Sequence, residues 1–229
     1  GLGCAVALAE AGAHVVCAAR GAERLNAVVA EMAAEGLSVE ALILDMADLD
    51  ALAATLDGLG VFDVVVNSAG LARHSPAFET RVEDYDAVMG VNLRAAHFLS
   101  AHVAKKMMAV GKRGSIIHIS SQMAHVGGID RSVYSASKHG LEGMVKAMAI
   151  EWGPLGIRIN TICPTFIRTP LAEQTLAIPE RRAWIEEKIK LGRVGEVEDI
   201  MGAVVYLASN ASQLVTGSAL LIDGGWTAD

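Results

Sequence analysis

Short apolar runs alternate with helical patterns along almost all of the 229 residues, and this alternation strongly restricts the possible folds. The two longest helical patterns cover 80–110 and 134–152. The runs typical of buried strands are 14–19, 39–44, 62–67, 114–120, 157–162 and 219–223. Apolar strands that alternate with helices are typical of a parallel sheet covered on both faces. The sequence therefore predicts a single-domain α/β protein, 1–229, with a doubly wound parallel sheet.

The composition fits such a sheet and argues against some classes of partner. Hydrophobic residues make up 52% of the chain and aromatic residues only 4%, so most apolar side chains are aliphatic. A net charge of −7 argues against a nucleic-acid partner, because phosphate contacts need clustered positive charge. No apolar run has the length that a bilayer requires, and no signal peptide is visible.

The three cysteines, Cys4, Cys17 and Cys163, are odd in number and scattered along the chain. This distribution favours a reducing compartment over a disulfide framework. There is no HExxH motif, and no histidine lies at ligand spacing from a cysteine or an acidic residue, so we expect no metal site. We expect a cytoplasmic protein that acts on a small molecule and has no membrane partner.

The chain opens on Gly1-Leu2-Gly3, enters a helical pattern at once, and reaches a strand-like run only at His14. This order is the second half of a strand–turn–helix–strand unit. We therefore expect the preceding strand to be missing from this sequence, which would leave a gap in the middle of the sheet. Glycines at a helix start fit a phosphate site, because free N–H groups and the helix dipole favour an anion. An ordinary tight turn is the alternative.

Polar residues at the carboxyl ends of the strands are informative, because ligands of doubly wound sheets bind there. Arg20 follows the run 14–19, where an acidic residue would bind the ribose hydroxyls of NAD. A guanidinium would instead pair with the 2′-phosphate of NADP, so NADP is favoured over NAD. A surface ion pair with Glu23 is the alternative. The small or polar residues Asn67–Gly70 would let the backbone approach a ligand closely, or would form a turn.

Tyr134 and Lys138 lie four residues apart in a helical pattern, and therefore on one face. A free tyrosine has a pKa of about 10, so it is a poor base unless a nearby cation stabilises the phenolate. Lys138 is spaced to supply that cation. Ser121, at the end of a strand-like run, could bind the oxygen of a carbonyl or an alcohol. Tyr–Lys pairs are also common on exposed helices, which is the alternative.

Several motifs span essentially the whole chain in a fixed order. They are GLG (1–3), NSAG (67–70), VNL (91–93), SSQ (120–122), YSASK (134–138) and CPTFIRT (163–169). Together they resemble the motifs of the short-chain dehydrogenase/reductase family, which has a Rossmann-like sheet. The resemblance implies an oxidoreductase that interconverts a secondary alcohol and a ketone with NAD(P). A dinucleotide-binding sensor or scaffold without turnover is the alternative.

The resemblance also implies a role for each matched residue. Tyr134 would donate or accept the proton, and Lys138 would lower its pKa and hold the nicotinamide ribose. Ser121, which is favoured over Ser120 by its spacing, would bind the reacting oxygen. Asn92 would anchor a water molecule in a proton relay with Lys138. The cofactor-binding residues would be Gly1, Leu2, Gly3, Arg20, Asp45, Met46, Asn67, Ser68, Ala69, Gly70, Tyr134, Lys138, Pro164, Thr165, Ile167 and Thr169.

Two positions depart from the family pattern. Ser68 replaces an asparagine, which weakens the inferred support of the central strand. Thr165 replaces a glycine beside the nicotinamide. The resemblance further implies a substrate lid over 170–193 and a homo-oligomer, commonly a tetramer, built through the two long helices and the C-terminal segment.

The substrate is less constrained than the reaction. Side chains expected near the site are cationic or hydrogen-bonding, namely Arg73, His74, Gln122, His125 and Arg168. They would suit a sugar acid, a polyol or another small polar hydroxy or oxo compound. Alternatively, they pair with surface carboxylates of Glu79, Glu173 or Glu180.

Overall fold

All the predicted strand runs form strands in the computed structural model, which describes residues 1–228 except for the side chains of Leu171 and Gln174. The strands are β1 (Val15–Ala19), β2 (Val39–Ile43), β3 (Val64–Asn67), β4 (Gly114–Ile119), β5 (Ile157–Pro164) and β6 (Ala219–Ile222). One sheet has the order β3-β4-β5-β6, β1 and β2 form a separate ladder, and every pairing is parallel. The predicted single-domain α/β fold is confirmed, although Asp229 lies outside the described residues.

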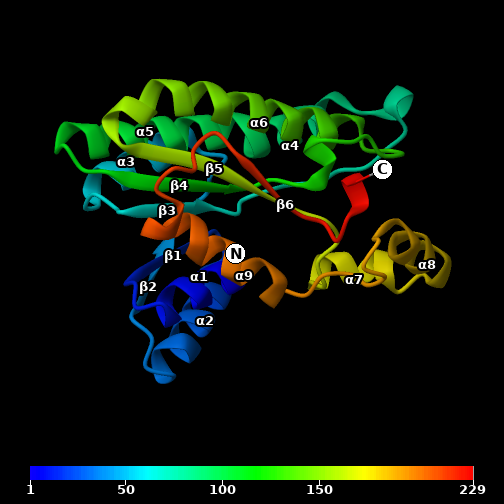
Figure 1. Ribbon diagram of the computed structural model, residues 1–229, viewed down its shortest axis with the longest axis horizontal. Helices are drawn as coiled ribbons and strands as arrows, with labels where there is room; N and C mark the ends of the chain where they lie inside the picture. Colours follow the sequence, from blue (N-terminus) through cyan, green and yellow to red (C-terminus); the bar gives the residue numbers. More distant parts are fainter. Residues whose placement is uncertain (229) are drawn as a thin grey trace.

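The sheet is interrupted between β1 and β3, where the sequence predicts a gap. No strand within residues 1–228 pairs with the edges of β1 and β3 that face this interruption. Figure 1 shows the β1–β2 ladder next to the β3 side of the larger sheet. Ala18 and Ala19 of β1 are exposed there.

Helices cover both faces of the sheet (Figure 1). On one face α3, α5 and α6 pack onto Ile116 and Ile159, and on the other α1 and α9 pack onto Ile117 and Ile162. Neighbouring strand residues point to opposite faces, which explains how Ile116 and Ile117 belong to different clusters. The helices are α1 (Leu2–Glu10), α2 (Ala22–Ala34), α3 (Leu49–Gly58), α4 (Val82–Met89), α5 (Ala96–Ala109), α6 (Ser132–Trp152), α7 (Pro170–Leu176), α8 (Pro179–Lys188) and α9 (Glu198–Ala208).

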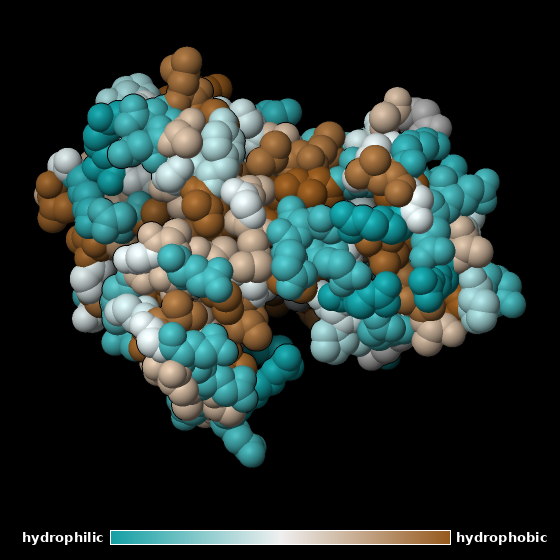
Figure 2. Space-filling view, turned by 60° about the horizontal axis from the view of Figure 1, so that its bottom comes forward, coloured by the Kyte–Doolittle hydropathy of each residue, from teal (hydrophilic) through white to brown (hydrophobic). Residues whose placement is uncertain are grey.

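A third apolar cluster lies at the carboxyl end of the sheet. It joins Met123, which follows β4, to Ile185 of α8 and to Trp226 near the C-terminus, and Tyr134 packs against it. In Figure 1 the helices α7 and α8 stand at this end of the molecule, beside the C-terminus. Figure 2 shows a hollow in the surface between the part that carries α2 and the part that carries α7 and α8. Within the described residues, no helix is both long enough and apolar enough to cross a membrane.

Candidate active site

Tyr134 and Lys138 face the same space from the first turns of α6. The Lys138 Nζ atom lies 5.8 Å from the centroid of the Tyr134 ring. Lys138 is only 3% exposed, and its ammonium donates a 3.0 Å hydrogen bond to the backbone carbonyl of Ile119 at the end of β4. The predicted placement of these two groups on one face is therefore confirmed, and the burial of Lys138 excludes the surface-pair alternative.

The pKa values of this pair are set mainly by burial. Burial raises the pKa of Tyr134 above its ordinary value, although the nearby Ser121 hydroxyl and the charge of Arg131 oppose the shift. Burial also lowers the pKa of Lys138 to about 8, against the opposing effects of Cys163 and Glu142. The charge of Arg131 opposes the rise in the pKa of Tyr134, but desolvation outweighs it; that Lys138 also lowers this pKa stays a prediction. At neutral pH Tyr134 holds its proton.

Ser121 reaches the same space from the end of β4. Its buried hydroxyl accepts a 3.1 Å hydrogen bond from the Met123 N–H and donates one of 3.2 Å to Oε1 of Gln122. It also lies close enough to Tyr134 to act on the pKa of the phenol, whereas the buried Ser120 hydroxyl has no hydrogen-bond partner among the described residues. The structure thus favours Ser121 over Ser120 as the hydroxyl that shares a site with the phenol.

Asn92 lies in a π-helical turn, η2 (Gly90–Ala95), which interrupts the predicted helix 80–110 between α4 and α5. π turns are frequent at functional sites. The Asn92 side chain is 1% exposed, accepts from the N–H of Leu71 at 2.7 Å, and donates to the Leu71 carbonyl and to the Ser137 hydroxyl. Because all of these bonds are internal, the side chain fixes the loop after β3 against α6. A relay water held by Asn92 stays a prediction.

A buried chain of hydrogen bonds fixes the end of β3. The Asn67 amide donates at 3.1 Å to Nδ1 of His118, and its carbonyl oxygen accepts from the N–H of Ala69. His118 Nε2 lies 2.8 Å from the Ser100 hydroxyl, which donates onward to the Ala96 carbonyl. The side chain of Asn67 is thus used to shape the loop, and its backbone remains to line a ligand. Sequence reasoning missed His118, because nothing in the sequence pairs it with Asn67.

The predicted dinucleotide-binding residues gather at the same edge of the sheet. The N-cap of α1, Gly1, makes no side-chain capping bond, so the first-turn N–H groups of Leu2 and Gly3 keep their capacity to bind an anion. A Cβ atom on Gly1 would lie 2.5 Å from Oγ of Ser68, so the loop 67–70 directly meets this helix start. Arg20 is exposed and forms no ion pair with any described residue, including Glu23.

The remaining predicted contacts lie at the ends of β2 and β5. Asp45 accepts a 2.9 Å hydrogen bond from the N–H of Ala47, and Met46 packs against the core. The buried hydroxyl of Thr165, just after Pro164, has no hydrogen-bond partner among the described residues. Ile167 pairs with Gly195 through the backbone, and Thr169 caps α7. The orphaned Thr165 hydroxyl and the uncapped start of α1 fit a ligand with an amide at one end and phosphates at the other, as in a nicotinamide dinucleotide.

Among the residues predicted near the substrate, the two arginines are occupied elsewhere. Arg73 pairs with Asp84 at 2.5 Å, and Arg168 pairs with Glu173 and Glu196 at 3.0 Å each. This agrees with the surface-pairing alternative for these two.

The other predicted side chains lie closer to the chemistry. Gln122 is 3% exposed beside Ser121, and the His74 ring lies edge-on to that of Tyr134 at 6.0 Å. Arg131, which sequence reasoning did not single out, joins them.

The fold brings together one cluster that sequence spacing did not show. Ligand-type atoms of His125, Glu142 and Cys163 all lie within 4.8 Å of one another. The Glu142 carboxylate already accepts hydrogen bonds from the hydroxyl of Thr161 and the thiol of Cys163, and burial raises the pKa of that thiol to about 12. Glu142 and Cys163 are thus hydrogen-bonded in the core, whereas His125 is exposed at the edge of the cluster.

Known proteins are similar to this chain in sequence. The sequence profile described as Enoyl-(Acyl carrier protein) reductase matches residues 1–227. L-xylulose reductase of Bos taurus is 37% identical over 97% of this chain and 89% of its own length. Gluconate 5-dehydrogenase of Gluconobacter oxydans is 36% identical over 99% of this chain and 90% of its own length.

Solved structures agree with the fold. A gluconate 5-dehydrogenase from Burkholderia cenocepacia, in complex with NADP and tartrate, superposes with a TM-score of 0.95 at 31% identity, over 100% of this chain and 92% of that one. The match over the whole chain, in sequence and in structure, shows that this protein belongs to the short-chain dehydrogenase/reductase family of NAD(P)-dependent oxidoreductases.

Proposed function

We propose that the chain is an NADP-dependent oxidoreductase that interconverts a secondary alcohol and a ketone on a small sugar-like substrate. The observation that carries this proposal is the enclosed set of Ser121, Tyr134 and Lys138, in which a protonated phenol lies against a hydroxyl and a buried ammonium. The named relatives act on sugars and sugar acids, which supports a substrate of this class.

Each residue of the set has a definite task in this proposal. The dinucleotide, when bound, supplies or accepts the hydride. Ser121 hydrogen-bonds the reacting oxygen and fixes it beside the phenol. Tyr134, whose raised pKa keeps it protonated, donates its proton to that oxygen in the reducing direction. Lys138, with a pKa of about 8, can return a proton at near-neutral pH, with the backbone of Asn92 as the proposed holder of a relay water.

Tyr134→Phe tests the proposal against the alternative of a dinucleotide sensor. The substitution removes the proton donor and keeps the ring that packs against the third apolar cluster. We expect turnover of sugar-like substrates to fall at least ~100-fold, in line with the usual contribution of a general acid, while dinucleotide binding in a fluorescence titration is retained. Unchanged turnover would rule out the mechanism, and a wild-type chain that binds dinucleotide and turns over no substrate would favour the sensor.

The preference for NADP rests on Arg20. Its exposed guanidinium at the end of β1 has no ion-pair partner among the described residues and is therefore available for a 2′-phosphate. The related Burkholderia enzyme was solved with NADP. Arg20→Ala should raise the KM for NADP about tenfold or more and change the KM for NAD much less, with Arg24→Ala, an exposed arginine on α2, as the control. Equal losses with both dinucleotides would contradict this assignment.

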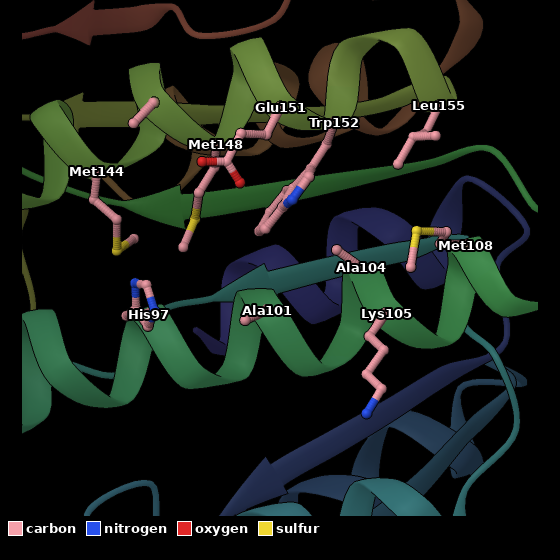
Figure 3. A pocket seen from close by; sticks show the side chains of 11 residues that line it. His97, Ala101, Ala104, Lys105, Met108, Met144, Met148, Glu151, Trp152 and Leu155 are labelled. Carbon is pink, nitrogen blue, oxygen red and sulfur yellow. The ribbon is translucent and has the colours of Figure 1, made fainter.

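A homotetramer is also part of the proposal. A groove of about 480 Å³ runs between α5 and α6, with Met144, Met148 and Trp152 on one wall and Ala101, Ala104 and Met108 on the other (Figure 3). It lies away from Tyr134, along the two long helices through which the family resemblance implies subunit contact. Its apolar walls support a second copy of the chain as its occupant.

The segment 170–193 is proposed as a substrate lid. It holds α7 and α8, and Ile185 of α8 belongs to the cluster against which Tyr134 packs. A lid attached there would cover the phenol when closed.

Cys4, Cys17 and Cys163 are all free in the structure, which supports the proposed reducing, cytoplasmic compartment.

A further inference from the structure

The guanidinium of Arg131 is partly buried near Tyr134, which lies three residues further along the chain. Its central carbon lies 5.6 Å from the centroid of the Phe166 ring, and its Nη1 lies 2.8 Å from Nε2 of His74. Burial lowers its pKa, and its charge opposes the rise that burial causes in the pKa of Tyr134. Arg131 is thus a partly desolvated cation at the reacting end of the site.

Arg131 has no carboxylate partner in the part of the chain that the structure describes. Three other arginines near this end of the molecule, Arg73, Arg168 and Arg193, each form an ion pair of 3.0 Å or less. The acidic side chain that acts on Arg131 is that of its neighbour Asp130, which is exposed to solvent. A partly buried cation without an anion is costly, so a ligand that brings an anion would be stabilised here.

The surrounding structure holds the guanidinium in place rather than leaving it free to turn toward solvent. Phe166, from the segment after β5, lies under it, and His74, from the segment after β3, bonds its edge. The N–H of Ser75 donates a 3.2 Å hydrogen bond to the Asp130 carbonyl, which ties the two loops together. A second cation, Arg181 of α8, is close enough to lower the pKa of Arg131. Two neighbouring guanidinium groups favour an anion between them.

We infer that Arg131 binds a carboxylate of the substrate, so that the chain acts on a hydroxy or oxo acid of the sugar-acid type in preference to the matching neutral polyol. The inference rests on the proposed function, because it places the reacting carbon of the same molecule at Tyr134. The planar guanidinium is suited to a carboxylate, which it can bind through two parallel hydrogen bonds. The other polar side chains around the phenol, His74 and Gln122, can bind the hydroxyls of such an acid.

The test compares an aldonate with the polyol of the same carbon skeleton, using the full chain with NADP. Arg131→Met removes the charge and keeps much of the side-chain volume. Arg131→Lys keeps the charge, and Arg81→Met removes the charge of an exposed arginine. We expect the wild-type chain to prefer the aldonate. The ratio of kcat/KM for aldonate to that for polyol should fall about 10- to 100-fold in Arg131→Met, less in Arg131→Lys, and not at all in Arg81→Met.

Binding of the same compounds, measured by the shift in melting temperature, separates this inference from the proposed function. If the wild-type chain binds the aldonate and Arg131→Met does not, the carboxylate site is supported. If, in addition, no compound is turned over, the proposed function fails and the carboxylate site still stands. Equal losses for aldonate and polyol in Arg131→Met, or a wild-type chain that binds polyols as tightly as aldonates, would overturn the inference and leave the proposed function standing.

Discussion

His118 makes the stability of this protein depend on pH in a way that can be calculated. It is completely buried in β4, and burial, with a smaller contribution from Lys138, lowers its pKa from 6.5 to about 3. Below pH 6.5 the His118 imidazole therefore binds a proton in the unfolded chain but not in the folded chain. The free energy of unfolding falls as the pH drops from about 6.5 to about 3. At 1.36 kcal/mol per pKa unit the full loss is ~5 kcal/mol, of which ~2 kcal/mol falls between pH 7 and pH 5.

The substitution His118→Gln isolates this effect. A glutamine amide can accept from Asn67 and donate to Ser100, as the neutral imidazole does, but it does not titrate. In urea unfolding at pH 7 and pH 5, the wild-type chain should lose ~2 kcal/mol more free energy of unfolding than the variant, which corresponds to roughly 4–8 °C in melting temperature. His139→Gln, at an exposed position of α6, serves as the control and should keep the wild-type loss.

An equal loss in the wild-type chain and in His118→Gln would refute the reasoning, because it would mean that His118 is protonated as easily in the folded chain as in the unfolded one. A variant that is less stable at both values of pH, but shows the flatter dependence, would leave the argument intact. The difference between the two slopes is the measured quantity, so an imperfect fit of the glutamine does not obscure it.

Three further results are expected. Lys138→Met should abolish most turnover. It should nevertheless raise the free energy of unfolding at pH 7 by about 1–3 kcal/mol, because burial lowers the pKa of Lys138 from 10.5 to about 8. In urea unfolding, the wild-type chain should become more stable between pH 8 and pH 10.5, and the variant should not. Gly3→Ala places a Cβ atom 2.2 Å from Cγ1 of Val197 and should cost about 1–3 kcal/mol in the same assay, with partial recovery on adding Val197→Ala. Ala147→Arg, in the groove between α5 and α6, should yield smaller species by light scattering, whereas Ala54→Arg on exposed α3 should not. A wild-type assembly that survives Ala147→Arg would contradict the proposed interface.

The sequence was sufficient for the strands and for the face that Tyr134 and Lys138 share. Strands in a covered parallel sheet are apolar throughout, so runs such as 157–162 stand out without any knowledge of their neighbours. The spacing of four residues fixes Tyr134 and Lys138 on one side of α6, because helix geometry alone decides it. Both predictions depend on local chain geometry, and both are confirmed.

The electrostatics of the site could not be read from spacing. The pKa of Tyr134 depends on how much water the third apolar cluster excludes, and this cluster is built from η3 (Gln122–Ala124), α8 and the C-terminal segment. The bond between Asn67 and His118 joins residues 51 positions apart, and the contact between His74 and Arg131 joins residues 57 apart. Such pairs become neighbours only when the parallel strands bring their ends to one edge.

The raised pKa of Tyr134 has a consequence for the direction of the chemistry. A phenol that keeps its proton at neutral pH is ready to donate it to a ketone, whereas oxidation of an alcohol first requires the phenolate. Arg131 lowers that pKa, so a carboxylate bound to Arg131 would cancel part of its field and hold the phenol still more firmly in the protonated form. An acid substrate would therefore help to keep Tyr134 protonated. Arg131 binds the carboxylate, and the neutralisation of its charge favours proton donation from Tyr134 to the neighbouring ketone.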